Sequence, residues 1–131
     1  MDELVLIDSS AWIDYLRVGN TATSTHVDQV LEFDAAAVCG LVKAELLQGA
    51  RSASEYERLS LQLNALTQLD DPPSLWSDVA QLGFELRRSG HNGPRIPDLV
   101  IAVTALHHEV SLLTLDRHFK LIKELRPLRF A

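Results

Sequence analysis

Three short aliphatic runs, separated by longer amphipathic segments, constrain the fold of this chain more than any other sequence feature. The runs cover Leu4–Ile7, Ala35–Cys39 and Ser111–Leu115, and none of them contains a charged side chain. Strands that read as continuous apolar runs are typical of parallel sheets, which are buried on both faces. Because parallel strands need long crossover connections, the segments between the runs should be helical.

Apolar residues at spacings of three and four predict helices in those segments. The clearest helix covers residues 54–66, where Ser54 and Glu57 form a capping-box pattern at its start. Further helices are expected at residues 11–18, 25–33, 41–47, 75–88, 97–108 and 118–125, and a terminal strand at 128–130. Strands that alternate with helices indicate an α/β fold with a mainly parallel sheet covered on both faces.

Length and composition limit the organisation of the chain. Its 131 residues match one ordinary domain, and no repeat, low-complexity segment or linker divides it, so a single domain over residues 1–131 is expected. The single cysteine, Cys39, excludes an intrachain disulfide and a cysteine-based zinc site. The acidic start and the lack of a membrane-spanning apolar run predict a soluble, cytoplasmic protein with no membrane partner.

The charge of the chain is unevenly distributed. A net charge of -6 argues against a protein that coats nucleic acid by bulk charge. Residues 1–65 hold 4 Lys+Arg against 10 Asp+Glu, whereas residues 66–131 hold 8 of each. Most basic residues therefore follow position 86, where they are able to form a local basic rim beside an acidic centre.

Four carboxylates occupy positions where apolar neighbours predict partial burial. Asp8 and Asp116 each follow a predicted buried strand, Glu45 lies between apolar pairs in a helix, and Asp98 lies in the first turn of an apolar helix. Ligands of parallel sheets bind outside the carboxyl ends of the strands, where Asp8 and Asp116 are expected. The joint placement of the acids indicates a shared site.

Partly buried carboxylates need compensation, because like charges that lie close together raise one another's pKa or require a cation. The four acids either pair with Arg or Lys, cap helices separately, or meet around a hard ion such as Mg²⁺ or Mn²⁺. The histidines show no metal-ligand spacing, and none of them is assigned a role. The chain has no glycine-rich phosphate loop and no nucleophile elbow.

Four segments resemble the motifs of PIN-domain ribonucleases, particularly the VapC-type toxins of bacterial and archaeal toxin–antitoxin pairs. The segments contain the four acids in order and lie at Val5–Ile13, Val42–Ala50, Arg95–Ala102 and Leu113–Phe119. The resemblance covers nearly the whole chain. One departure is Leu99-Val100, where the family often has a more polar residue.

The resemblance implies a PIN-like three-layer α/β/α sandwich, a homodimer, and inhibition by a cognate antitoxin that inserts near the active site. It also implies metal-dependent endonucleolytic cleavage of RNA of the translation machinery. By this interpretation Asp8 and Asp98 hold the main Mg²⁺ or Mn²⁺, while Glu45 and Asp116 complete the site and help to recruit a second ion.

The same interpretation gives roles to residues around the acids. Ser9 and Thr114 are expected to orient the metal ligands. Candidates for contact with the RNA backbone are Arg87, Arg88, Arg95 and Arg117. Each of these arginines has the alternative role of a solvated side chain or a partner for the acids.

Two other functions remain open at this point. A receiver-like signalling domain also gathers acids at strand ends and binds Mg²⁺, but it needs a Lys after a late strand, and the first Lys after Asp116 is Lys120. A non-catalytic module would use the acids to bind a basic peptide.

Overall fold

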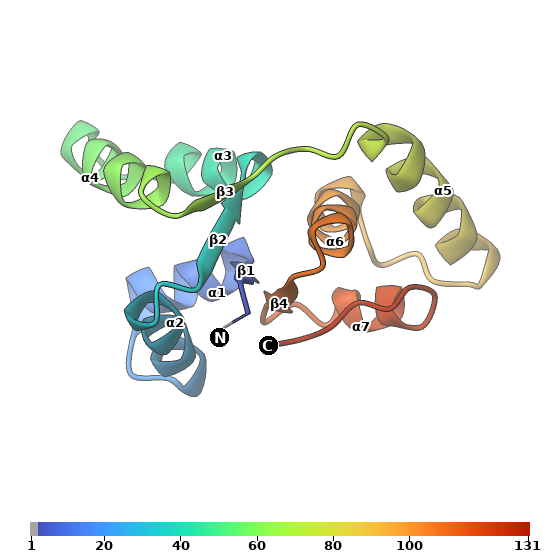
Figure 1. Ribbon diagram of the computed structural model, residues 1–131, viewed down its shortest axis with the longest axis horizontal. Helices are drawn as coiled ribbons and strands as arrows, with labels where there is room; N and C mark the ends of the chain where they lie inside the picture. Colours follow the sequence, from blue (N-terminus) through green and yellow to red (C-terminus); the bar gives the residue numbers. More distant parts are fainter. Residues whose placement is uncertain (1–2) are drawn as a thin grey trace.

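The computed structural model describes residues 3–131 as a sheet surrounded by helices (Figure 1). The strands are β1 (Val5–Ile7), β2 (Ala36–Cys39), β3 (Thr67–Leu69) and β4 (Ser111–Leu113). The α-helices are α1 (Ser9–Ile13), α2 (Ala22–Glu32), α3 (Gly40–Gln48), α4 (Ala53–Asn64), α5 (Leu75–Arg88), α6 (Ile96–His108) and α7 (His118–Lys123). A π-helical segment, η1 (Asp14–Val18), continues directly from α1.

The four strands form one sheet in the order β3-β2-β1-β4, and every neighbouring pair is parallel. In Figure 1 the sheet lies between α1 and α2 on one side and α6 and α5 on the other. The predicted three-layer α/β/α sandwich with a parallel sheet is thereby confirmed.

The strand order creates a switch point between β1 and β4. The chain adds β2 and β3 to one side of β1 and later returns to add β4 to its other side. The register pairs Ile7 with Leu113, so the next residues along the two strands are Asp8 and Thr114. Connections leave such a switch point in opposite directions, and this opens a crevice at the carboxyl ends of the strands.

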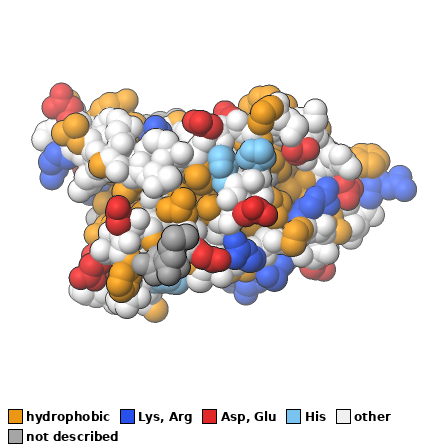
Figure 2. Space-filling model, viewed as in Figure 1, with side chains coloured by type: hydrophobic (Ala, Val, Ile, Leu, Met, Phe, Trp, Pro, Cys, Tyr) orange, Lys and Arg blue, Asp and Glu red, His pale blue; other side chains and the backbone are white. Residues whose placement is uncertain are grey.

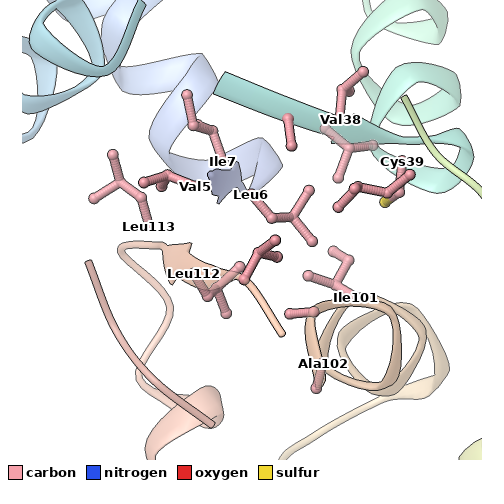
Figure 3. Packing of buried hydrophobic residues seen from close by; sticks show 14 of the residues in the cluster. Val5, Leu6, Ile7, Val38, Cys39, Ile101, Ala102, Leu112 and Leu113 are labelled. Atoms are coloured by element: carbon pink, nitrogen blue, oxygen red, sulfur yellow. The ribbon is translucent and has the colours of Figure 1, made fainter. Parts of the chain in front are cut away.

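Aliphatic side chains fill the core between the sheet and α6. Leu6 of β1, Leu112 of β4 and Ile101 of α6 are at most 2% exposed. Figure 3 shows these side chains meeting in the layer between the strands and the helix. This packing holds α6, and with it Asp98, against the crevice.

The structure also differs from the sequence prediction. β3 was not predicted, because only Leu69 of its three residues is buried and an edge strand lacks the continuous apolar signal. The Ser54 capping box is wrong: α4 begins earlier, and the Ser52 hydroxyl accepts a hydrogen bond from the Glu55 N–H at 3.1 Å. The predicted terminal strand is reduced to a single bridge between Leu112 and Phe130.

Helix boundaries near the N-terminus are shifted as well. α2 begins at Ala22 rather than Thr25, because the Thr21 hydroxyl accepts a hydrogen bond from the Ser24 N–H and caps the helix. Gly19 ends η1 with a φ of 73°, as the sequence predicted for the helix stop. Within residues 3–131, no helix is both long and apolar enough to cross a membrane.

The core packing leads to a stability prediction. Leu6→Ala should lower the free energy of unfolding by about 2–5 kcal/mol, because it leaves a cavity under the central strand. Leu61→Ala is the control, since Leu61 is 75% exposed on α4 and its loss should change stability by less than about 0.5 kcal/mol. Urea denaturation of both variants measures the difference. Equal losses would contradict the described core.

Candidate active site

Asp8 is the most buried acid of the candidate site. It is 6% exposed and directly follows β1 at the switch point. Its Oδ2 accepts hydrogen bonds from the Ser10 Oγ and the Thr114 Oγ1, both at 2.7 Å. These hydroxyls compensate the buried charge and fix the orientation of the carboxylate.

Thr114 connects the ends of β1 and β4. Besides donating to Asp8, its hydroxyl accepts a hydrogen bond from the Asp116 N–H at 3.0 Å and lies 3.2 Å from the Ser10 Oγ. Ser10 in turn accepts a hydrogen bond from the Leu115 N–H. Thr114 was predicted to orient the metal ligands, whereas Ser10 was interpreted as a helix-start hydroxyl near the metal site, without a named partner. A Ser two residues after an acid is too common a pattern to indicate a partner.

Asp98 lies in the first turn of α6, where its Oδ2 accepts a hydrogen bond from the Arg95 N–H at 2.9 Å. Burial raises the pKa of its carboxyl above the ordinary value. The Arg95 hydrogen bond opposes this rise, whereas the negative charges of Asp116 and Asp8 add to it. Three acids from distant parts of the chain therefore act on one another.

Asp116 is held at the start of α7. Its Oδ1 accepts a hydrogen bond from the His118 N–H at 2.9 Å. The His118 Nδ1 lies 3.4 Å from this oxygen and 3.8 Å from the Asp98 Oδ2. One potential ligand atom from each of Asp98, Asp116 and His118 lies within 4.8 Å of the others.

No role was assigned to His118 from the sequence, and the structure places its ring beside Asp98 and Asp116. It follows Asp116 by two residues, which is not a helical metal-ligand spacing. The contact with Asp98 depends on how α6 and α7 pack, so no signal in the sequence pointed to it.

Glu45 differs from the sequence expectation. It lies on α3 and was expected to be partly buried, but the residue is exposed. At 100° per residue, Val42 and Leu46 form the buried line of α3 and Glu45 lies at its edge. Its Oε1 accepts a hydrogen bond from the Ser9 Oγ at 2.7 Å, so Ser9 orients Glu45 rather than Asp8.

All four acids share one feature that suits a cation. Among residues 3–131, one oxygen of each carboxylate is held by a protein donor, and the other oxygen has no protein hydrogen bond. Fixed carboxylates with a free oxygen fit hard ions such as Mg²⁺ and Mn²⁺, which prefer oxygen ligands. Asp98 and Asp116 lie close together with His118, and the charge of Asp8 acts on Asp98. Glu45 is connected to this group through Ser9, the residue after Asp8.

On the face of the molecule that Figure 2 shows, Lys and Arg side chains gather over the region of α5 and α7. Within residues 3–131, Arg87, Arg88, Arg95 and Arg117 have no salt bridge, whereas Arg126 pairs with Glu85. Arg87 and Arg95 line a groove of about 610 Å³ between α5 and the start of α6. Arg117 lies with Lys120 and Asp116 along a second groove of about 330 Å³.

A family model of the PIN domain matches residues 5–125. The chain belongs to the PIN-domain family. The match contains the four acids of the site and all four strands of the sheet.

Named relatives of this PIN domain are VapC ribonucleases. It is 38% identical over 94 residues to ribonuclease VapC17 of Mycobacterium tuberculosis, with 70% of each chain covered. It is 28% identical over 131 residues to ribonuclease VapC11 of the same organism, with 98% of each chain covered.

Solved structures agree on the fold. A chain of VapBC2 from Rickettsia felis, crystallised with a promoter DNA fragment, matches with a TM-score of 0.76 and 17% identity over 98% of this chain and 97% of that one. A chain of the DNA-bound VapBC from Salmonella typhimurium matches with a TM-score of 0.74 and 18% identity, covering 99% and 98%.

The raised pKa of Asp98 leads to a prediction about stability. A raised folded-state pKa means that the ionised carboxylate destabilises the fold, so Asp98→Asn should raise the melting temperature at pH 7 in EDTA. The amide oxygen can still accept the Arg95 hydrogen bond. The gain should disappear below pH 3.8, where the carboxyl is protonated in both states.

The control for this measurement is Asp70→Asn, because Asp70 is exposed in the loop before α5. Thermal melts across pH, without metal, compare the two variants. A melting temperature of Asp98→Asn equal to or below the wild-type value at pH 7 would show that the carboxylates do not strain one another.

Proposed function

We propose that this protein is a metal-dependent endoribonuclease and the toxin component of a toxin–antitoxin pair, formed by one PIN domain over residues 1–131. The observation that carries this proposal is the set of oriented carboxylates with free oxygens at the β1–β4 switch point. The names of the VapC relatives support the ribonuclease activity. A receiver-like domain or a peptide-binding module would not need four acids held in this way.

Asp8, Asp98, Asp116 and Glu45 are the residues that would hold Mg²⁺ or Mn²⁺. When bound, the ion supplies charge stabilisation at the scissile phosphate and lowers the pKa of a water molecule. The chain positions its ligands in advance: Ser10 and Thr114 hold Asp8, the Arg95 N–H holds Asp98, and Ser9 holds Glu45. The outer position of Glu45 suits it to accept a proton from the attacking water or to help hold a second ion.

The two grooves give RNA a path across the site. Arg87 and Arg95 line the groove beside the start of α6, and Arg117 lines the groove that contains Asp116. Within residues 3–131, none of the three arginines forms a salt bridge. Arginine forms bidentate contacts with phosphate, which would place the backbone over Asp98 and Asp116. Such a path leaves the acids to act on one phosphodiester. We propose RNA of the translation machinery, in the cytoplasm, as the substrate.

The central experiment is an RNA cleavage assay with purified protein. Wild type should cleave RNA with Mg²⁺ or Mn²⁺ and stop in EDTA, and Asp98→Asn should lower the rate at least about a hundredfold, because the amide brings no charge to the ion. Asp70→Asn should remain fully active. Cleavage by Asp98→Asn at the wild-type rate, or wild-type cleavage unaffected by EDTA, would refute the proposed mechanism.

The proposed RNA path has its own test. Arg95→Ala and Arg117→Ala should each weaken RNA binding and reduce the slope of log K against log salt by about 0.7, the value for one lost contact on a single strand. Arg51→Ala is the control, since Arg51 lies between α3 and α4. Binding is measured in Ca²⁺ by fluorescence anisotropy. Unchanged slopes would place the RNA elsewhere.

A protein partner is proposed from exposed apolar residues and from the neighbours. The structures of similar fold are VapBC complexes. On this chain, Ile13, Leu16 and Val18 are 40% to 68% exposed on α1 and η1. Leu16 also lines a groove of about 270 Å³ with Leu59 of α4. An antitoxin that covers this surface and places a basic side chain against the acids would block the site.

Co-expression with the neighbouring open reading frame tests this partner. The complex should form, and it should lose nuclease activity until the partner is removed. Light scattering of the chain alone should show the proposed homodimer, which would bury exposed apolar residues such as Trp76. A monomer that neither binds the neighbour's product nor is inhibited by it would refute the toxin proposal and leave the nuclease proposal intact.

A further inference from the structure

We infer that His118 is a metal ligand of this site and gives it a nitrogen donor beside the carboxylate oxygens. The inference rests on the proposed metal-dependent function of the four acids. It adds a residue that lies outside that acidic set, and it names the class of ion that the site prefers.

The ring of His118 packs closely against Gly93. A Cβ at Gly93 would lie 2.8 Å from the Cδ2 and 2.9 Å from the Nε2 of the ring, which is closer than real Cβ contacts. The backbone of the loop before α6 therefore packs directly against this edge of the imidazole. The opposite edge, with the Nδ1, faces Asp98 and Asp116.

The distances between these three groups suit a shared ion. Two ligand atoms that each lie about 2.1 Å from an ion are about 3.0 Å apart at a right angle and about 3.4 Å apart at the tetrahedral angle. The Nδ1 of His118 is 3.4 Å from the Asp116 Oδ1 and 3.8 Å from the Asp98 Oδ2. One ligand atom from each of the three residues lies within 4.8 Å of the others. The Asp98 Oδ2 and the Asp116 Oδ1 each accept one backbone N–H hydrogen bond and keep a second lone pair for an ion.

The backbone of His118 is also tied to Asp116. The His118 N–H donates to the Asp116 Oδ1, so residues 116 and 118 are tied together at the start of α7. Phe119, the next residue, is fully buried and anchors α7 in the core. These contacts keep the backbone of His118 beside Asp116, and its side chain, which is 46% exposed, is accessible to an ion from solvent.

A nitrogen ligand changes the preferred metal. Mg²⁺ is bound mainly through carboxylate and water oxygens, whereas imidazole suits later first-row ions, and affinity for mixed N/O sites rises from Mn²⁺ onward. The site should therefore bind Mn²⁺ more tightly than Mg²⁺, and His118 should be the cause of that preference.

The test measures metal binding without RNA, on the full chain. In titration calorimetry with MnCl₂ alone, His118→Ala should weaken Mn²⁺ binding about tenfold or more, with a smaller effect on MgCl₂. His118→Asp should bind Mn²⁺ more tightly than His118→Ala does, because it again supplies a ligand. Its affinity for Mg²⁺ relative to Mn²⁺ should be higher than in wild type, because that ligand is an oxygen. His107→Ala, an exposed histidine at the far end of α6, should behave as wild type.

A spectroscopic measurement identifies the ligand directly. Electron spin-echo spectra of bound Mn²⁺ should show coupling to a histidine nitrogen in wild type and in His107→Ala, and no such coupling in His118→Ala. Nitrogen coupling that persists in folded His118→Ala, or Mn²⁺ affinity unchanged by that substitution, would overturn the inference.

Gly93 gives a second, independent variant. Gly93→Ala should displace the ring and weaken Mn²⁺ binding, and the double variant with His118→Ala should be no weaker than His118→Ala alone, since both act through one group. Additive losses would overturn the role of Gly93 in holding the ring.

The outcomes also separate this inference from the proposed function. Wild type that binds Mn²⁺ without nitrogen coupling, and cleaves RNA only with metal, would refute the ligand role of His118 alone. Wild type that binds neither ion and cleaves RNA in EDTA would refute both.

Discussion

The parallel pairing of β1 with β4 is the interaction on which the rest of this site depends. It sets Ile7 opposite Leu113, and the next residues on the two strands, Asp8 and Thr114, form a hydrogen bond between their side chains. A slip of β4 by one residue would turn its side chains to the other face of the sheet and separate Thr114 from Asp8. The buried aliphatic strands prevent that slip, so the hydrophobic core also fixes the position of the first acid.

Repulsion among the carboxylates is the second constraint. Asp98 is brought to Asp8 and Asp116 by the packing of α6 on the sheet, and the pKa of its carboxyl is raised by burial and by those charges. Hydroxyl and backbone donors hold one oxygen of each acid but do not neutralise the cluster. The cluster therefore favours cation binding. Without a cation, the repulsion lowers the free energy of unfolding, and a loss of stability of this kind is common at active sites.

Most of the fold could be predicted from the sequence, because its signals are local. The runs at Leu4–Ile7 and Ala35–Cys39 contain β1 and β2 almost residue for residue. β3 escaped prediction because Thr67 and Gln68 are exposed at the edge of the sheet, where burial leaves no pattern. The start of α4 was misplaced because Ser52 and Ser54 are equally good caps by residue type, and only the chain path selects Ser52.

For the candidate site, the sequence by itself selected four acids, Asp8, Glu45, Asp98 and Asp116, since each stands beside an apolar run at a strand end or in a helix. The tertiary structure alone decided which atoms meet. It joined Ser9 to Glu45 and Ser10 to Asp8, left Glu45 exposed, and placed His118 between Gly93 and two carboxylates. The burial of a residue follows from the local periodicity of apolar residues. Contacts between residues far apart in the chain depend on how strands and helices pack, and the spacing of residues in the sequence does not predict that packing.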